Sequence, residues 1–131
     1  MIVLDTNAWI WWVADPSKLS LRARRAIKQE EAKGAIVVSV ISVWEIALKH
    51  SLGKLILDRD VRAWLRMASQ YPGISVAPLT IDDAMEGPLL PGNLHRDPAD
   101  RFIVALSRRL GAPIITKDGN VRRYPHVQTL W

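Results

Sequence analysis

The stretch "DPADRFIVALSRRLGAPIITKD", residues 97–118, decides the fold class because it contains a helix and a strand in direct succession. Asp97 followed by Pro98 is typical of a helix start, and the apolar spacing predicts a helix over residues 97–111. The run "APIITKD" then predicts a short buried strand that ends on an acid. A helix followed by a buried apolar strand is typical of a parallel α/β sheet.

The rest of the chain repeats this alternation of strands and helices. Strands are predicted at residues 1–5, 35–40, 74–79 and 112–118, with a fifth edge strand at 126–130. Helices are predicted at residues 6–15, 20–33, 42–53, 59–70, 80–86 and 97–111, with Ser42 and Thr80 as N-caps. The predicted fold is α/β, a three-layer sandwich in which a central, mostly parallel sheet is flanked by helices.

The composition is that of one compact domain covering residues 1–131. Of the 131 residues, 49% are apolar, which is enough to form a core. No apolar run reaches the roughly 20 residues that a membrane span needs, and no secretory signal is visible, so we expect a cytoplasmic protein. The absence of cysteine excludes disulfides, thiolate metal sites and cysteine nucleophiles.

The formal charge of +5 favours a polyanionic partner such as nucleic acid or an acidic protein. The basic residues form three clusters, which are Lys18, Arg22, Arg24, Arg25 and Lys28; Arg59, Arg62 and Arg66; and Arg108, Arg109, Lys117, Arg122 and Arg123. Each cluster has two interpretations, a surface for an anionic partner or a solvated helix face, and the sequence leaves both open.

Acids occur where predicted strands end or where the following helices begin. Asp5 and Asp118 follow strands, Glu45 lies one turn into a helix, and Asp97 and Asp100 open the helix before the fourth strand. Ligands of open parallel sheets bind beyond the carboxyl ends of the strands, so these acids are expected to converge there.

Each acid also has a purely structural interpretation. Asp5 and Asp118 suit turns or caps, and Asp97 is a typical N-cap. Glu45 suits a capping box with Ser42. Only the coincidence of several acids at one edge of one sheet argues for chemistry.

Carboxylates that lie close together repel each other and need a counter-ion, which a divalent cation supplies. Hard carboxylate oxygens, without cysteine or a histidine pair, suit Mg²⁺ or Mn²⁺ better than Zn²⁺. Such an ion can activate water and stabilise charge on a phosphate, so no histidine base is needed.

Three segments together resemble the PIN domain family and, within it, the VapC-type toxins of bacterial and archaeal toxin–antitoxin systems. They are "IVLDTNAWIWW" (2–12), "SVISVWEIALK" (39–49) and "HRDPADRFIVALSRRLGAPIITKDGNVRRYPHVQTLW" (95–131). The resemblance covers nearly the whole chain, and the last segment is its most specific part.

The resemblance implies a metal-dependent endoribonuclease that cleaves RNA phosphodiester bonds. It implies that Asp5, Glu45, Asp100 and Asp118 are the catalytic acids and the ligands of one or two Mg²⁺ or Mn²⁺ ions. Asp97 is then a cap or an outer-shell acid, and Thr6, Asn7 and Thr116 are small polar residues that hydrogen-bond to ligands or substrate. Asn120 stands where some members carry a further acid, so a second metal site is weakened. The family also implies a small antitoxin partner and a homodimer.

The tryptophans offer a candidate surface for such partners. Trp9, Trp11 and Trp12 do not share one helical face, because two residues correspond to about 200° of rotation. At least one ring therefore packs beneath a neighbouring helix or contacts an antitoxin or a second copy. Trp44, Trp64 and Trp131 are expected in or near the core.

Two residues beside the acid pair have open roles. His95 either anchors the helix start, which we favour, or touches a substrate phosphate. Arg101 either contacts the phosphate backbone of an incoming RNA or balances the acids. His50 and His126 are expected to be at the surface or half-buried.

Two other functions are compatible with parts of the sequence. "VLDTN" weakly resembles the nucleophile motif of haloacid-dehalogenase phosphatases, but Asn7 occupies the position of their second aspartate. A PIN-like module that binds RNA or protein without cutting it is the other alternative, and metal-dependent cleavage would discriminate. Dinucleotide binding is disfavoured because no glycine-rich phosphate motif occurs.

Overall fold

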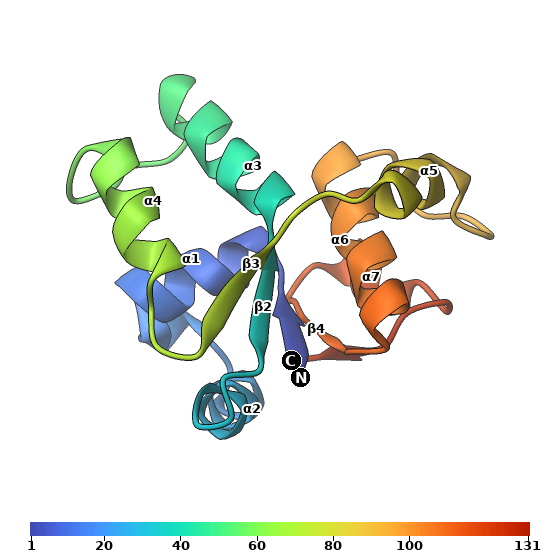
Figure 1. The fold of residues 1–131 in the computed structure, drawn as a ribbon, viewed down its shortest axis with the longest axis horizontal. Helices are drawn as coiled ribbons and strands as arrows, with labels where there is room; N and C mark the ends of the chain where they lie inside the picture. Colours follow the sequence, from blue (N-terminus) through green and yellow to red (C-terminus); the bar gives the residue numbers. More distant parts are fainter.

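A computed structural model describes all of residues 1–131, and it contains one five-stranded sheet with helices on both faces (Figure 1). The strands are β1 (Ile2–Leu4), β2 (Ile36–Ser39), β3 (Ile74–Ala77), β4 (Ile114–Ile115) and β5 (Thr129–Leu130). The helices are α1 (Thr6–Ala14), the 3₁₀ turn η1 (Pro16–Lys18), α2 (Leu21–Glu31), α3 (Val40–Ser51), α4 (Val61–Ser69), α5 (Ile81–Leu89), α6 (Pro98–Leu110) and α7 (Gly119–Arg123).

The sheet has the strand order β3-β2-β1-β4-β5, and every pair of neighbours is parallel. The central strand β1 pairs with β2 through Val3 and Val37, and with β4 through Val3 and Ile114. The predicted central parallel sheet, with its fifth strand at the edge, is confirmed. All carboxyl ends therefore lie along one edge, where α1, α3 and α7 begin.

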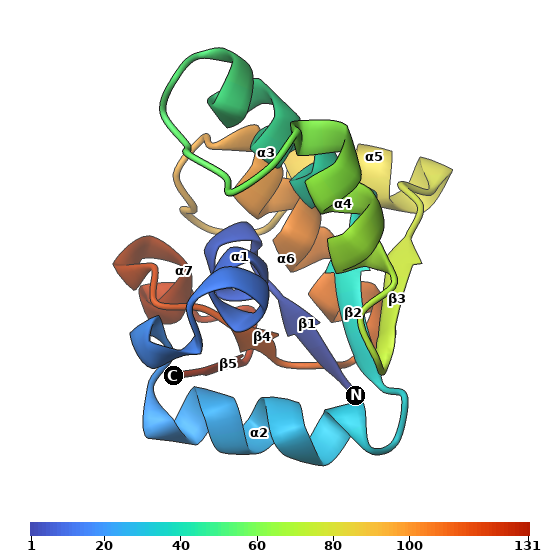
Figure 2. The same cartoon turned by 90° about the vertical axis from the view of Figure 1, so that its left-hand side faces the viewer.

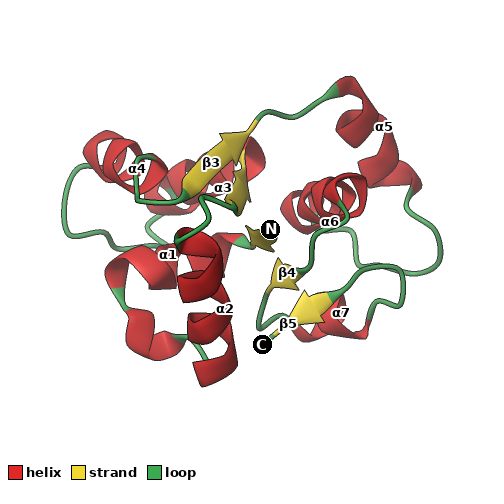
Figure 3. Ribbon diagram, turned by 60° about the horizontal axis from the view of Figure 1, so that its bottom comes forward, coloured by secondary structure: helices red, strands yellow, loops and turns green.

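The pleat of β1 divides the core into two halves. Ile2 and Leu4 belong to one buried cluster, and Val3 between them belongs to the other, as the alternation of side chains in a strand requires. Helices α1, α2 and α4 pack in the first half, whereas α6 and α7 pack in the second (Figures 1 and 2). Figure 3 shows the same layers in another orientation, with the strands between the two groups of helices.

Most helix starts are as the sequence predicts. The side chain of Ser20 accepts the Ala23 amide at the start of α2. Thr80 caps α5 and forms a capping box with Asp83. This helix is longer than predicted and continues through Pro88 to Leu89.

The predicted N-cap of α3 is wrong. The helix starts at Val40, and the capping side chain is Ser39, whose hydroxyl accepts the Ile41 amide. Ser42 is completely buried and accepts a hydrogen bond from Thr6. The capping box of Ser42 with Glu45 is therefore absent, because strand β2 ends earlier than its apolar pattern indicates.

The tryptophans divide into packed and exposed rings. Trp9 is buried, and the rings of Trp11 and Trp12 pack against Trp131 and Tyr71 respectively. These partners lie outside helices, at the end of the chain and in the turn after α4, so the predicted packing beneath a neighbouring helix is not what these two ring contacts show. Trp64 is also buried and Trp131 lies at the edge of the core, as predicted.

The prediction that Trp44 lies in or near the core is wrong. Its side chain is 49% exposed. Helix α3 turns Ser42 and Ile46 inward, and a residue two positions from each of them points about 200° away from that face.

None of the helices combines the length and the apolar composition that a membrane span requires.

Candidate active site

Asp5 ends β1 and starts α1. Its carboxylate accepts the Ala8 amide at 2.7 Å and is only 9% exposed. Burial raises the pKa of Asp5 to about 6, and the nearby charges of Asp100 and Asp118 add to the rise, although hydrogen bonds from Thr116 and the Ala8 amide oppose it. Asp5 is therefore both the N-cap of α1 and a member of a group of three repelling acids.

The acid pair at the start of α6 has divided roles. Asp97 is exposed and its carboxylate accepts the Asp100 amide at 3.1 Å, which confirms Asp97 as the N-cap. Asp100 is more enclosed, and burial raises its pKa to about 6, with Asp97 and Asp118 raising it further and His95 lowering it. The enclosed acid of the pair is the one that faces the other acids.

Asp118 lies three residues beyond the end of β4, which is shorter than the predicted strand over residues 112–118, and it is the N-cap of α7, a short helix absent from the predicted elements. Its carboxylate accepts the amides of Asn120 and Val121, and its own amide donates to the Thr116 hydroxyl at 3.0 Å. The Thr116 side chain also forms a hydrogen bond with Asp5, so this buried threonine lies between two acids.

Asp100, Asp118 and His95 form a group that can hold a divalent ion. One ligand atom from each of the three lies within 4.8 Å of the others. Asp5 is outside this tightest group, but its carboxylate is close enough for the charges of Asp100 and Asp118 to raise its pKa. Converging carboxylates, two of which have their pKa raised to about 6, form the donor set that Mg²⁺ or Mn²⁺ prefers.

Glu45, the fourth acid expected in the site, lies outside the tightest group and has a charged partner of its own. Its nearest charged partner is Lys49, one turn along α3, with 3.8 Å between Nζ and Oε2. It is not among the residues that approach one another closely enough to share an ion. The structure therefore brings Asp5, Asp100 and Asp118 together and leaves Glu45 in a separate ion pair.

The three small polar residues that the sequence predicts for the site, Thr6, Asn7 and Thr116, lie in different surroundings. Thr116 is buried beside Asp5 and Asp118. Thr6 donates to the Ser42 hydroxyl at 2.9 Å and so joins α1 to α3. Asn7 is exposed.

The two neighbours of the acid pair with open roles, His95 and Arg101, both make hydrogen bonds within the protein. His95 lies 2.6 Å from Asp100 through Nε2, which confirms that it anchors the helix start. Arg101 donates three hydrogen bonds to main-chain carbonyls and forms no ion pair, an arrangement that the sequence did not indicate. No local pattern could have revealed this, because two of the three acceptors lie seven and fourteen residues away.

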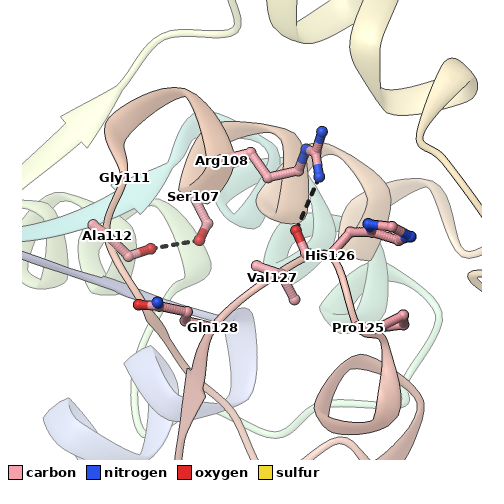
Figure 4. Close-up of a pocket in the computed structure, with 8 residues that line it drawn as sticks. All are labelled: Ser107, Arg108, Gly111, Ala112, Pro125, His126, Val127 and Gln128. Carbon is pink, nitrogen blue, oxygen red and sulfur yellow. Dashed lines mark hydrogen bonds between the residues drawn. The ribbon is translucent and has the colours of Figure 1, made fainter.

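A separate cavity of about 480 Å³ lies at the other end of α6 and contains no acid (Figure 4). Its walls are residues 107–112 and 125–128, which precede β4 and β5, so it opens at the amino ends of these strands. There Arg108 donates to the His126 carbonyl at 2.9 Å, and Ser107 donates to the Ala112 carbonyl. The exposed position of His126 agrees with the prediction, and nothing in this cavity resembles the acidic site.

Comparisons with known proteins identify relatives of the whole chain. The family model described as PIN domain matches residues 2–127. The "Ribonuclease VapC22" of Mycobacterium tuberculosis is 30% identical over 132 aligned residues, which cover 99% of this chain and 98% of that protein.

Solved structures share the fold at lower sequence identity. The structure titled VapBC2 from Rickettsia felis bound to a promoter DNA fragment contains a chain with a TM-score of 0.71 and 14% identity, covering 99% of this chain and 98% of that chain. FitAcB from Neisseria gonorrhoeae gives 0.69 and 17%, covering 100% and 97% of the two chains. A toxin–antitoxin complex from Klebsiella pneumoniae gives 0.65 and 16%, with the same coverage.

Proposed function

We propose, for a chain that belongs to the PIN domain family, that it is an endoribonuclease and the toxin of a toxin–antitoxin pair. The observation that carries the proposal is the convergence of Asp5, Asp100 and Asp118 at the carboxyl edge of the sheet, in a chain similar along its whole length to a ribonuclease. We propose that residues 1–131 act as one PIN domain in the cytoplasm.

The proposed cofactor is Mg²⁺ or Mn²⁺, held by Asp100 and Asp118 with Asp5 behind them. All three offer hard oxygen donors, and their mutual repulsion is relieved by a divalent cation. Such a cation supplies activation of water and charge stabilisation at the phosphate under attack. Glu45 stays in the proposed site as an outer acid that can leave Lys49, because its pair is 3.8 Å long and lies one turn away.

The residues of the chain itself prepare the substrate and the acids. Lys117, Arg122 and Arg123 are exposed on either side of Asp118, where they attract RNA phosphates towards the acidic edge. Thr116 orients Asp5 and holds the Asp118 amide. The basic side chains therefore lie next to the acidic site. They attract the phosphates of an RNA, which would otherwise be repelled by the carboxylates.

The proposed protein partners are a small antitoxin and a second copy of the chain. The antitoxin is inferred from the solved relatives, which were studied as VapBC, FitAcB and toxin–antitoxin complexes. For the homodimer, α3 offers an exposed apolar stripe at spacings of four residues. The stripe consists of Val40, Trp44, Leu48 and Leu52.

The test is to map RNA ends in total RNA after brief induction of the wild type and of Asp5→Asn. A toxin nuclease produces new ends at a limited set of positions, and these ends are absent with the variant because a carboxylate is lost from the acidic group. Purified wild type should cleave the same RNA only when Mg²⁺ or Mn²⁺ is added. A wild type that binds RNA but leaves it intact with either ion is the result expected of a non-catalytic PIN-like module.

A further inference from the structure

Arg101 follows an acid directly, yet none of its donors faces an acid. Its Nε donates to the His95 carbonyl at 3.1 Å, Nη2 to the Leu94 carbonyl at 2.6 Å, and Nη1 to the Gly87 carbonyl at 3.1 Å. These acceptors belong to the end of α5 and to the segment that leads into α6. One guanidinium therefore joins α5, α6 and the segment between them.

This arrangement needs an arginine and a close approach of the two helices. A guanidinium offers five donors in a rigid plane, whereas a lysine ammonium is a single point and cannot reach three separated carbonyls. Helix α5 is close to α6 at Gly87, where an added Cβ would lie 2.8 Å from the Phe102 ring. The segment is also fixed from its other side, because the Arg101 amide donates to the Asp97 carbonyl at 3.1 Å.

The segment held in this way carries His95. Its Nε2 lies 2.6 Å from Oδ2 of Asp100, and its Nδ1 is buried without a partner. Two donor atoms that share one ion in adjacent positions are about 3 Å apart, given metal–ligand distances of about 2.1 Å. The shorter separation is that of a hydrogen bond in which Nε2–H donates to the carboxylate.

A carboxylate group is planar, so a hydrogen bond that holds one of its oxygens also fixes the direction of the second oxygen. Asp100 is also held at its own main chain, since its amide donates to Asp97. Outer hydrogen bonds of this kind commonly orient metal-binding carboxylates and raise their affinity for the ion.

We propose that Arg101 and His95 are positioning residues for the acidic site: Arg101 fixes the main chain at residues 94–95, and His95 thereby orients the Asp100 carboxylate towards Asp118. The proposal rests on the proposed function, in which Asp100 is a ligand of the divalent ion. It assigns to the arginine of the "DPADR" stretch an indirect role, away from both ion and substrate.

The test measures binding of Mn²⁺ by calorimetry without RNA, together with the melting temperature of the metal-free protein. We expect His95→Ala to weaken Mn²⁺ binding about tenfold or more at an unchanged melting temperature, as losses of outer hydrogen bonds do. His95→Gln keeps an N–H donor and is expected to restore most of the affinity. Arg101→Lys is expected to weaken binding by about tenfold and to speed hydrogen exchange in residues 94–97.

Arg96→Gln is the matched control, because it removes one positive charge from the same segment at an exposed side chain that makes no hydrogen bond. It should leave Mn²⁺ affinity and hydrogen exchange as in the wild type. Wild-type Mn²⁺ affinity in His95→Ala or Arg101→Lys would overturn the positioning role.

Pulsed electron paramagnetic resonance of the bound Mn²⁺ separates positioning from ligation. Direct coupling to a histidine nitrogen that disappears in His95→Ala would make His95 a ligand and would also overturn the proposal. A wild type that binds no Mn²⁺ and cuts no RNA would instead refute the proposed function, and the positioning role with it. A nuclease that is active in the wild type and unaffected in the variants refutes the positioning role alone.

Discussion

At the scale of single residues, two aspartates three positions apart have acquired different tasks through their surroundings. Asp97 faces solvent and completes the first turn of α6. Asp100 is turned into the protein, where burial, Asp97 and Asp118 all favour its protonated form and His95 opposes this. The difference in environment, and not in residue type, separates a capping acid from a candidate ligand.

This separation predicts opposite outcomes for two matched substitutions. Asp100→Asn should reduce RNA cleavage by about a hundredfold or more, because it removes a charge from the group that holds the ion. Asp97→Asn should retain measurable activity, since asparagine is also a good N-cap. Cleavage rates at saturating Mn²⁺ with matched circular dichroism spectra would check this, and the reverse order of the two variants would exchange the roles assigned here.

The acids also predict how the metal-free protein responds to pH. The pKa of Asp5 rises from about 3.8 in the unfolded chain to about 6 in the folded protein, so the folded state binds the proton more tightly. Stability of the metal-free protein should therefore fall as pH rises from about 4 through 6, with the full cost of the charged form present above pH 6. Two pKa units correspond to about 3 kcal/mol, which is an upper bound for this one group.

Asp5→Asn removes that cost and should stabilise the metal-free protein at pH 7.5 by about 1–3 kcal/mol, although it abolishes cleavage. The gain should approach zero at pH 4 and should also decrease when Mn²⁺ is added, because the ion stabilises the wild type, with three acids, more than the variant, with two. Urea unfolding at both pH values in the presence of a chelator is the measurement. A wild type that is more stable than the variant at pH 7.5 would contradict the assigned shift.

At the scale of elements, α5 and α6 are joined by an ion pair between the buried carboxylate of Asp83 and the more exposed guanidinium of Arg109. Asp83 accepts two hydrogen bonds from Arg109, at 2.8 and 2.9 Å, and its side chain is only 3% exposed. It also accepts the Thr80 amide in the capping box. The pair of helices that carries the Arg101 contacts is thus held at a second point along its length.

Asp83→Asn should destabilise the protein by about 1–3 kcal/mol, because it leaves the Arg109 guanidinium without its charged partner and weakens the cap. Asp82→Asn is the control, since Asp82 precedes it in the same helix turn and is exposed. The free energies of unfolding of the two variants are compared by urea unfolding. Equal values would show that the pair of Asp83 with Arg109 makes no net contribution to stability.

The elements also show how far the sequence could predict the structure. Apolar runs and caps were sufficient for the parallel sheet, for α2 and for α6, because these signals act over a few residues. The start of α3 was misplaced because both Ser39 and Ser42 can cap, and only the contact of Ser42 with Thr6 decides between them. Helix α7 was missed because five residues carry too little periodicity.

The residues in and around the site also divide into those whose positions the sequence could predict and those whose positions it could not. Asp5, Asp100 and Asp118 could be predicted to approach one another because parallel strands place their carboxyl ends at one edge. The three-carbonyl contact of Arg101 depends on the geometry of the segment between α5 and α6, which no local pattern contains. The ion pair of Glu45 with Lys49 follows the i,i+4 spacing of a helix, and the sequence alone does not show whether Glu45 takes this partner or the acidic site.

At the scale of the whole molecule, the exposed apolar stripe on α3 contains Trp44, the tryptophan whose predicted position in or near the core is wrong. Trp44 lies at its centre, with Val40 and Leu48 one turn away on either side. A surface tryptophan flanked by aliphatic side chains is typical of a protein interface. The stripe supports the proposed homodimer.

Trp44→Asp should convert a dimer into a monomer, because a charge would be buried at the centre of the proposed contact. Light scattering after size exclusion, over a range of concentrations, measures the mass. Met85→Asp is the control, since Met85 is an equally exposed apolar residue on a different helix, α5. A wild type that is monomeric at high concentration, or a Trp44→Asp variant that remains dimeric, would exclude this face.

The position of β1 at the centre of the sheet has a consequence for synthesis of the protein. Strand β1 leaves the ribosome first, but its neighbour β4 follows more than one hundred residues later, since Val3 pairs with Ile114. At about 5–20 residues per second, several seconds separate the two strands, and contacts so distant in sequence form slowly. Asp5 therefore has no contact with Asp118 until the segment 112–118 has been synthesised, and a chain truncated or stalled before this segment carries no assembled acidic site.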